Sequence, residues 1–153
     1  MPMLYTYVMH TSSAPEDLVR AAGGLSRWAS SHAELGAPPA TLRLLVMVEE
    51  HGPIRVGDLA EADHTSQPAV TRQVGRLHSL GWVDRTHDPD DARACLVVIT
   101  EPGRRALVRA RRARGEVMNR LLADAGIAEH RVREAADLLH QLLTAARTAA
   151  DKV

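Results

Sequence analysis

Apolar residues recur at helical spacing along most of the chain, and the breaks between the stretches divide it into six predicted helices. Glycine or proline ends several of them, as at Gly52-Pro53, Gly81 and Gly126. The first helix begins at a capping box, Ser13 to Glu16, with Pro15 in its first turn. The others are predicted at 41–51, 56–62, about 66–80, 100 to about 123, and from about 128.

The periodicity changes to that of strands between residues 82 and 100. The segments 82–86 and 94–100 predict a β-hairpin, because Asp88-Pro89-Asp90-Asp91 between them suits a type I turn. A short extended piece, Ile54-Arg55, precedes the helix at 56–62. The resulting fold class is mainly α (α+β), with a winged helix-turn-helix in the middle of the chain.

The long terminal helices have more apolar surface than this small lobe can cover. Two copies packed together would cover it, which predicts an obligate two-fold dimer. We therefore assign 1–37 and 101–153 to a helical dimerisation region and 38–100 to the winged helix-turn-helix lobe. Within that lobe we expect the recognition helix at about 66–80 and the wing at about 82–100.

Composition limits where in the cell the protein can be expected and which partners it can bind. No apolar run approaches the roughly 20 residues that span a membrane, and the first ten residues lack the pattern of a signal peptide. Cys95 is the only cysteine, so no intrachain disulfide can form, and we expect a cytoplasmic protein. The chain has no Phe, which argues against stacking platforms for single-stranded nucleic acid.

The formal net charge of zero hides an uneven distribution. Residues 64–115 contain ten arginines and five acidic residues, a net charge of +5. Residues 1–63 contribute −4 and residues 116–153 contribute −1. The positive charge thus falls on the predicted recognition helix, the wing and the helix that follows, which favours double-stranded DNA as a partner.

The predicted recognition helix has an apolar face and a polar one. With Val70, Val74 and Leu77 turned inward, the opposite face holds Pro68, Arg72, Gly75 and Arg76, with Thr71 at its edge. Its N-terminus, the end that enters a major groove and suits a phosphate, holds Ser66, Gln67, Ala69 and Thr71. Gln67 is suited to adenine, and Arg72 or Arg76 to guanine or phosphate. The alternative is an ordinary solvated helix face.

The predicted wing places an arginine next to an acidic turn. A narrow minor groove attracts an inserted arginine, and Arg93 is positioned for that contact. Asp91, two residues earlier, can bond its guanidinium and hold it extended. We expect Asp88 to cap the turn, Asp90 to face solvent, and both to point away from the DNA. The alternative is an Asp-Pro turn with an incidental surface ion pair.

Two segments together resemble the MarR (multiple antibiotic resistance regulator) family of bacterial transcription factors. "DPDDARACLVVITEPGR" is similar to the family's wing pattern, and "LAEADHTSQPAVTRQVGRLHSLGWVDR" to its recognition segment. The resemblance implies a triangular homodimer that binds a pseudopalindromic operator and usually represses transcription. It also implies Arg93 in the minor groove with Asp91 as its support, and Gln67, Ala69, Thr71 and Arg72 in the major groove.

The chain departs from the family pattern at two places. Gly75 stands where the family often has Asp, and a glycine there weakens the helix by about 1 kcal/mol relative to alanine. Ile99-Thr100 replaces the commoner Leu-Thr, which we expect to be neutral.

The resemblance also suggests an effector. Many family members sense phenolic acids between the dimer helices and the DNA lobe, so we expect a small aromatic or phenolic effector. Trp28 and His32, on the first long helix, are the candidate pocket residues. A place in the core or the dimer interface is the alternative for Trp28.

The chain offers weaker grounds for redox or metal sensing. The family's oxidant sensors have a cysteine near the N-terminal helix, whereas Cys95 is expected to be a buried or half-buried strand residue. No two histidines are spaced three or four apart, so we predict no metal site and no cofactor. Convergence in space of four histidines is the alternative, namely His51, His64, His78 and His87.

Catalysis is not predicted. Asp63 to Ser66 contains the letters of a catalytic triad, but neighbours in sequence do not face one another as a triad requires. A winged helix used for protein contact would have apolar or acidic groups in place of Thr71, Arg72 and Arg76. The main prediction is a dimeric, ligand-responsive repressor. The alternatives are a winged-helix protein-interaction module and a metal- or redox-responsive regulator.

Overall fold

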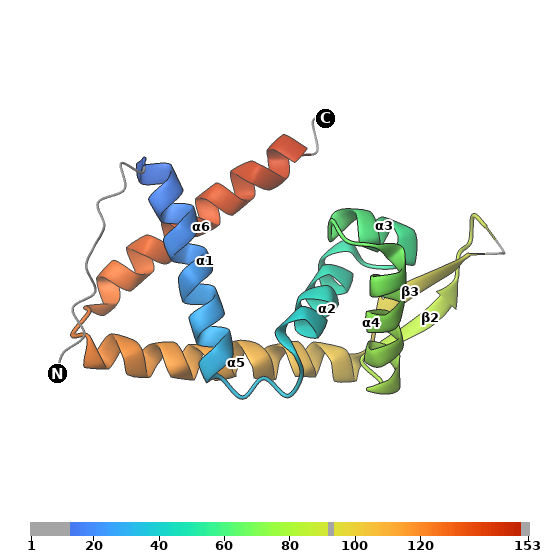
Figure 1. Cartoon of the computed structure of the whole chain (residues 1–153), viewed down its shortest axis with the longest axis horizontal. Coiled ribbons are helices and arrows are strands. Elements are labelled where there is room, and N and C mark those ends of the chain that lie inside the picture. Colours follow the sequence, from blue (N-terminus) through green and yellow to red (C-terminus); the bar gives the residue numbers. More distant parts are fainter. Residues whose placement is uncertain (1–12, 92–93, 151–153) are drawn as a thin grey trace. The chain divides into compact units, whose positions relative to one another are not determined.

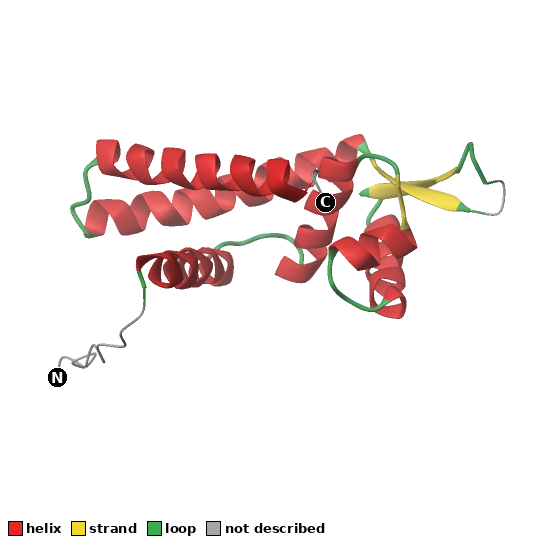
Figure 2. Ribbon diagram, turned by 90° about the horizontal axis from the view of Figure 1, so that it is seen from above, coloured by secondary structure: helices red, strands yellow, loops and turns green. Residues whose placement is uncertain are grey.

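The computed structural model describes residues 13–91 and 94–150, and it is mainly helical with one small sheet (Figure 1). Figure 2 shows the same helices and strands from above. The elements in chain order are α1 (Ala14–His32), α2 (Pro39–His51), β1 (Ile54–Arg55), α3 (Val56–Ala62), α4 (Gln67–Ser79), β2 (Val83–His87), β3 (Cys95–Ile99), α5 (Glu101–Asp124) and α6 (Glu129–Ala150). The predicted mainly helical, winged helix-turn-helix fold is confirmed, with element ends shifted by one or two residues.

Contacts divide the chain into two compact units, Met1–Arg114 and Gly115–Val153, with the boundary inside α5. The division expected from the sequence, 38–100 for DNA and the rest for dimerisation, depends on a partner copy and stays a prediction. Among the described residues, no helix combines the length and apolar character needed to cross a membrane.

The sheet of the first unit is antiparallel, in the order β1-β3-β2. The hairpin register runs from Val83 opposite Ile99 to His87 opposite Cys95. The two-residue β1 adds a third strand, with Arg55 opposite Leu96. β3 therefore lies in the middle of the sheet, and the wing loop leaves it beyond His87.

The core of the first unit lies where α2, α3, α4 and the start of α5 meet the sheet. Val70, Val74 and Leu77 are fully buried, so the inward stripe predicted for α4 is confirmed. They belong to one apolar cluster with residues of the neighbouring elements, among them Leu42, Leu45, Val48, Leu59, Val83, Val97 and Leu107. The orientation of α4 is fixed by this packing, because its buried face has a single complementary surface.

The start of α5 is bonded to the base of the wing. The Thr100 backbone N–H donates to the Trp82 carbonyl at 3.0 Å, and the Thr100 hydroxyl donates to the Gly81 carbonyl at 2.6 Å. The same hydroxyl accepts from the Gly103 backbone N–H at 3.2 Å. Gly103 is buried there, against the Trp82 backbone. These bonds explain why Thr and Gly stand three residues apart after the second wing strand.

The second unit consists of the end of α5 and all of α6. Gly126, with a φ of +63°, follows α5, and its N–H donates to the Ala123 carbonyl at 3.1 Å. α6 exposes a cluster of leucines, namely Leu138, Leu139, Leu142 and Leu143. A lone exposed leucine is ordinary on a protein surface, but four on one helix form an apolar patch.

Candidate nucleic-acid interface

The N-terminus of α4 is exposed, and its N-cap residue Ser66 makes no side-chain capping hydrogen bond. Ser66 is the N-cap residue in extended conformation, and its carbonyl accepts from the N–H groups of Ala69 and Val70 at 2.9 and 3.1 Å. The side chains of Ser66, Gln67, Pro68 and Thr71 are all exposed at this end. The Thr71 hydroxyl donates to the Gln67 carbonyl at 2.8 Å. Its proton is therefore engaged, and toward a ligand the hydroxyl oxygen can act only as an acceptor.

The outer face of α4 is basic and borders a groove. Arg72 and Arg76 are exposed, and both line this groove together with Ala69. The groove has a volume of about 290 Å³ and is lined by Pro38, Ala40, Thr41, Ala69, Arg72, Gln73 and Arg76. The buried Thr41 hydroxyl donates to Gln73 Oε1 at 3.1 Å, which holds α4 against α2. Of the seven contact residues predicted at α4, the structure thus brings three to one groove and the other four to the adjoining helix end.

The turn between α3 and α4 is held by an arginine that the sequence analysis missed. Arg43 of α2 contacts the Asp63 carboxylate with both terminal nitrogens, at 2.6 Å and 3.1 Å. The Asp63 side chain is 6% exposed, so the pair is a strong constraint on the end of α3. His64 follows with a φ of 49°, and the Thr65 N–H donates to the Ala60 carbonyl at 3.0 Å. The stretch from Asp63 to Ser66 is therefore the tight turn of the helix-turn-helix.

The wing loop is closed by backbone hydrogen bonds and by Asp88. The Asp88 N–H donates to the Ala94 carbonyl at 3.2 Å, and the Ala94 N–H donates to the Asp91 carbonyl at 2.9 Å. Asp88 Oδ1 accepts from the Asp90 N–H at 2.9 Å, so Asp88 does cap the turn as predicted. Arg93 lies outside the described residues, and its contact with Asp91 stays a prediction.

Asp88 has a partner that the sequence analysis missed. Its side chain is 5% exposed and is paired with Arg55 of β1, while its expected orientation away from DNA stays a prediction. Arg55 Nε donates to Asp88 Oδ2 at 2.6 Å. Asp90 is exposed, as predicted. The tip is therefore less acidic than its three aspartates suggest. No local sequence pattern indicates this pair, because its members are 33 residues apart.

The Arg55–Asp88 pair shifts both pKa values. The Asp90 N–H has the largest effect on Asp88 and lowers its pKa; burial acts in the opposite direction, and Arg55 lowers it further. The pKa of Arg55 is raised, first by its hydrogen bond to Asp88 and then by the charge of that carboxylate. Both shifts favour the charged forms at neutral pH.

A pH dependence follows from the lowered pKa of Asp88. The stability that its carboxylate contributes is fully present above about pH 3.9, the ordinary Asp value, and is lost as pH falls through the lower folded-state pKa. We expect Asp88→Asn to be less stable than the wild type at pH 6, and the gap to close below pH 3.9. Urea unfolding of both proteins between pH 2.5 and 6 measures this. A gap that stays constant over that range would contradict the prediction.

Two further expectations concern redox and metal sites. Cys95 is exposed, not buried or half-buried, because it opens β3 opposite His87 at the loop end of the hairpin. Within the described part of the chain, no three His, Cys, Asp or Glu side chains gather closely enough to hold a metal ion. The alternative of four converging histidines is therefore not found there.

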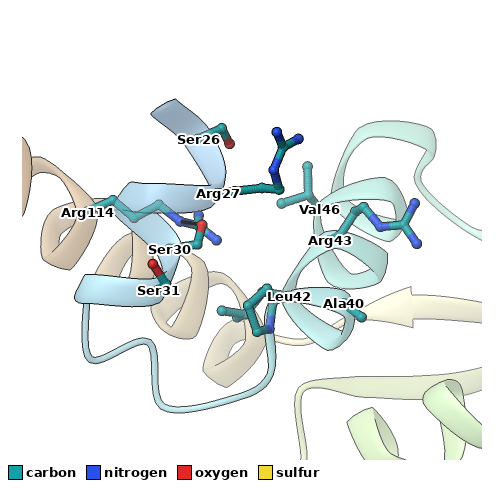
Figure 3. Close-up of a pocket in the computed structure, with 10 residues that line it drawn as sticks. Ser26, Arg27, Ser30, Ser31, Ala40, Leu42, Arg43, Val46 and Arg114 are labelled. Carbon is teal, nitrogen blue, oxygen red and sulfur yellow. Dashed lines mark hydrogen bonds between the residues drawn. The ribbon is translucent and has the colours of Figure 1, made fainter. Parts of the chain in front are cut away.

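A pocket lies beside α1 and α2 in the first unit (Figure 3). Its volume is about 590 Å³, and its lining includes Arg27, Arg43 and Arg114 with the serines Ser26, Ser30 and Ser31. Arg114 of α5 donates from Nε to the Ser30 hydroxyl at 3.0 Å. The predicted effector residues Trp28 and His32 do not line this pocket. Their rings stack on each other with centroids 4.5 Å apart. A role for them in effector binding stays a prediction.

Comparison with known proteins points to one family. A model described as "MarR family" matches residues 38–95. The uncharacterized HTH-type transcriptional regulator Mb0904 of Mycobacterium bovis is 35% identical over 103 residues, covering 67% of this chain and 72% of that protein. The HTH-type transcriptional repressor MdtR of Bacillus subtilis is 29% identical over 113 residues, covering 74% and 72%.

Solved structures agree on the fold. A mutant MarR from Escherichia coli matches with a TM-score of 0.71 at 22% identity, covering 86% of this chain and 97% of that one. The same mutant complexed with operator DNA matches with a TM-score of 0.56 at 22% identity, covering 86% and 99%. Its relatives are transcriptional regulators, not enzymes. This chain belongs to the MarR family, and it is a transcriptional regulator with a DNA-binding winged helix.

Proposed function

We propose that this regulator is a homodimer that represses transcription from a pseudopalindromic operator and is released by a small molecule. The observation that supports it best is the outer face of α4, where Arg72 and Arg76 are exposed beside an exposed helix N-terminus. The alternative, an ordinary solvated helix face, would not explain the basic groove beside it. The relative MdtR is named a repressor, and MarR from Escherichia coli has been solved with operator DNA.

In this proposal α4 enters the major groove and the wing enters the minor groove. Gln67, Ala69, Thr71 and Arg72 face base edges, while Ser66, Pro68 and Arg76 lie along the phosphates. Asp91 holds Arg93 extended in the minor groove. Each copy of the dimer then contacts one half-site.

The test is fluorescence anisotropy with the upstream region of the protein's own gene and a random duplex, each at two salt concentrations. Affinity for both should fall steeply with salt, since arginines that neutralise phosphates release counterions. The upstream duplex should bind more tightly at both concentrations. Equal affinity for the two duplexes at both salts would exclude sequence-specific regulation of that site.

Removing the wing arginine tests the minor-groove contact. We expect Arg93→Ala to weaken binding to the specific duplex by about 1–3 kcal/mol, and Asp91→Ala to weaken it less. Arg20→Ala is the matched control, because Arg20 forms an exposed ion pair with Asp17 on α1. If Arg93→Ala and Arg20→Ala bind equally well, the wing arginine has no part in recognition.

The effector site proposed here is the pocket lined by Arg27, Arg43 and Arg114. The arginines Arg27 and Arg114 beside a cavity of about 590 Å³ suit a small aromatic acid, whose ring fills the space and whose carboxylate pairs with arginine, whereas the Arg43 guanidinium is already paired with Asp63. Leu42 and Val46 of α2 supply apolar contacts to the ring.

The charge of the ligand is the feature to test. We expect 2-hydroxybenzoate to raise the thermal midpoint of the protein and to weaken its binding to the specific duplex. The uncharged 2-hydroxybenzyl alcohol should do neither. Arg114→Gln should reduce the response to the acid. A thermal shift that is equal for the acid and the alcohol would show that the arginines do not contribute to ligand binding.

A further inference from the structure

A nearly buried ion pair joins the wing loop to the opposite edge of the sheet. Arg55 contacts Asp88 Oδ2 with Nε at 2.6 Å and with a terminal nitrogen at 2.5 Å. The Asp88 side chain is 5% exposed, whereas that of Arg55 is 44% exposed. The carboxylate is therefore enclosed, and the guanidinium forms part of the surface.

The sheet register shows how the pair is built. Arg55 on β1 and Thr86 on β2 are both opposite Leu96 of the central strand. Residues opposite one another share a face of the sheet, so these three lie on one face, away from Ile54 and Val97 in the core. Asp88 follows Thr86 by two residues. The arginine thus spans the central strand to reach the first residue of the loop.

Asp88 is also the residue on which the loop closes. Its N–H donates to the Ala94 carbonyl, and its second carboxylate oxygen accepts from the Asp90 N–H. Arg93 belongs to the loop between Asp88 and Ala94. A bond that fixes the Asp88 side chain to β1 therefore fixes the closing point of the loop, where Asp88 and Ala94 meet, relative to the sheet.

We propose that Arg55 and Asp88 form a positioning pair that directs the wing loop into the minor groove, with Arg55 acting through Asp88 and not by touching DNA. The inference rests on the proposed minor-groove contact of the wing. A two-stranded ribbon on its own twists and bends easily, and a third strand at its base leaves the loop end unsupported. The pair supplies that support where the strand pairing ends.

The pair also neutralises part of the negative charge of the loop. Without Arg55, the Asp88 carboxylate would either stay enclosed without a cation or turn outward. A carboxylate that turns outward next to the DNA backbone is repelled by the phosphates. Loss of Arg55 should therefore weaken wing contacts even though the loop keeps its backbone hydrogen bonds.

The experiment uses a minor-groove probe. A duplex is first selected by the wild-type protein from a random library. Base pairs at its wing-contact flanks are then made either G·C or inosine·C, which have the same major-groove edge but differ by the guanine amino group in the minor groove. Anisotropy at several salt concentrations gives the affinity ratio of the two duplexes for each protein.

The wild type should prefer the inosine duplex by about fivefold or more, the size of one base-pair contact. Arg55→Gln, Asp88→Asn and the double variant should all lose this preference, and the double variant should lose no more than either single one. Arg55→Lys should restore part of it. Arg20→Gln, which removes an arginine from an exposed ion pair on α1, should keep it in full.

The outcomes separate the two proposals. If the wild type shows no preference, the minor-groove contact of the wing fails and this inference fails with it. If the wild type shows it and the folded Arg55→Gln and Asp88→Asn proteins keep it, only the positioning pair is overturned. If Arg55→Gln weakens binding and lowers the salt slope while Asp88→Asn does neither, Arg55 contacts a phosphate directly, which also overturns it.

Discussion

Gly103→Ala is expected to destabilise the protein by about 3 kcal/mol or more, at the upper end of the range for overpacked cores. An added Cβ would lie 2.1 Å from the Trp82 carbonyl oxygen and 3.0 Å from both the Trp82 carbonyl carbon and Ile99 Cγ1. The obstacle is mainly backbone, so no side-chain rotation relieves it. Either α5 moves away from the wing, or the Thr100 bonds to Gly81 and Trp82 break.

Helix propensity alone predicts the opposite sign for the same substitution. Alanine is about 1 kcal/mol better than glycine inside a helix. Gly115, in the same helix, provides the matched control, because nothing lies within 4 Å of the Cβ position there. Gly115→Ala should therefore stabilise the protein by about 0.5–1 kcal/mol. Urea unfolding at one fixed protein concentration compares the two variants with the wild type.

A result in which both variants are more stable than the wild type would show that α5 does not pack on the wing as described. The expected result would show that α5 packs tightly against the wing at Gly103. The hydroxyl of Thr100 bonds to Gly81 at the base of the hairpin and to Gly103 of α5. A shift of α5 would therefore also displace the base of the hairpin.

The sequence predicted the parts of this fold that depend on local periodicity. The stripe of Val70, Val74 and Leu77 was sufficient to orient α4, because one apolar face of a helix must face the core. The hairpin followed from alternation and from the Asp-Pro turn. The predicted contact residues on α4 are accordingly at its exposed end or beside its groove.

The sequence could not predict the contacts between polar and charged residues that are distant in the chain. Arg55 and Asp88 are 33 positions apart, Arg43 and Asp63 are 20 apart, and Arg114 and Ser30 are 84 apart. Such contacts depend on how elements pack, and a single sequence has no period that reveals them. Cys95 was misplaced for a related reason. Its apolar neighbours in sequence suggested burial, but the strand end lies at the open end of the hairpin.

The double variant Leu138→Glu, Leu142→Glu is expected to abolish high-affinity operator binding. Four leucines are exposed on α6, and the two substituted here are one turn apart on the same side of the helix. Burying a leucine side chain contributes about 1.5–3 kcal/mol, so a second copy packed on this patch would be strongly stabilised. Glutamates at both positions would remove that contribution and add like charges to the patch of each copy.

The effect on DNA follows from the loss of bivalent contact. A dimer that holds one half-site binds the second with a high effective concentration, which raises affinity by about 10²–10⁴. A monomer loses this factor but keeps its winged helix intact. We therefore expect binding to the full operator to fall by that factor while binding to a half-site duplex changes little. Sedimentation velocity and anisotropy on the two duplexes measure both effects.

Gln141→Glu is the matched control for the double variant, because it adds a charge at an exposed position of α6 and removes no leucine. It should stay dimeric and bind as the wild type does. Circular dichroism must show that the double variant keeps its helices, since a monomer that unfolds would lose half-site binding as well. A folded double variant that remains a dimer and binds the full operator normally would place the dimer contact elsewhere than on this patch of α6. In that case the exposed leucines would need another explanation, while the DNA-binding surface of α4 would be unaffected.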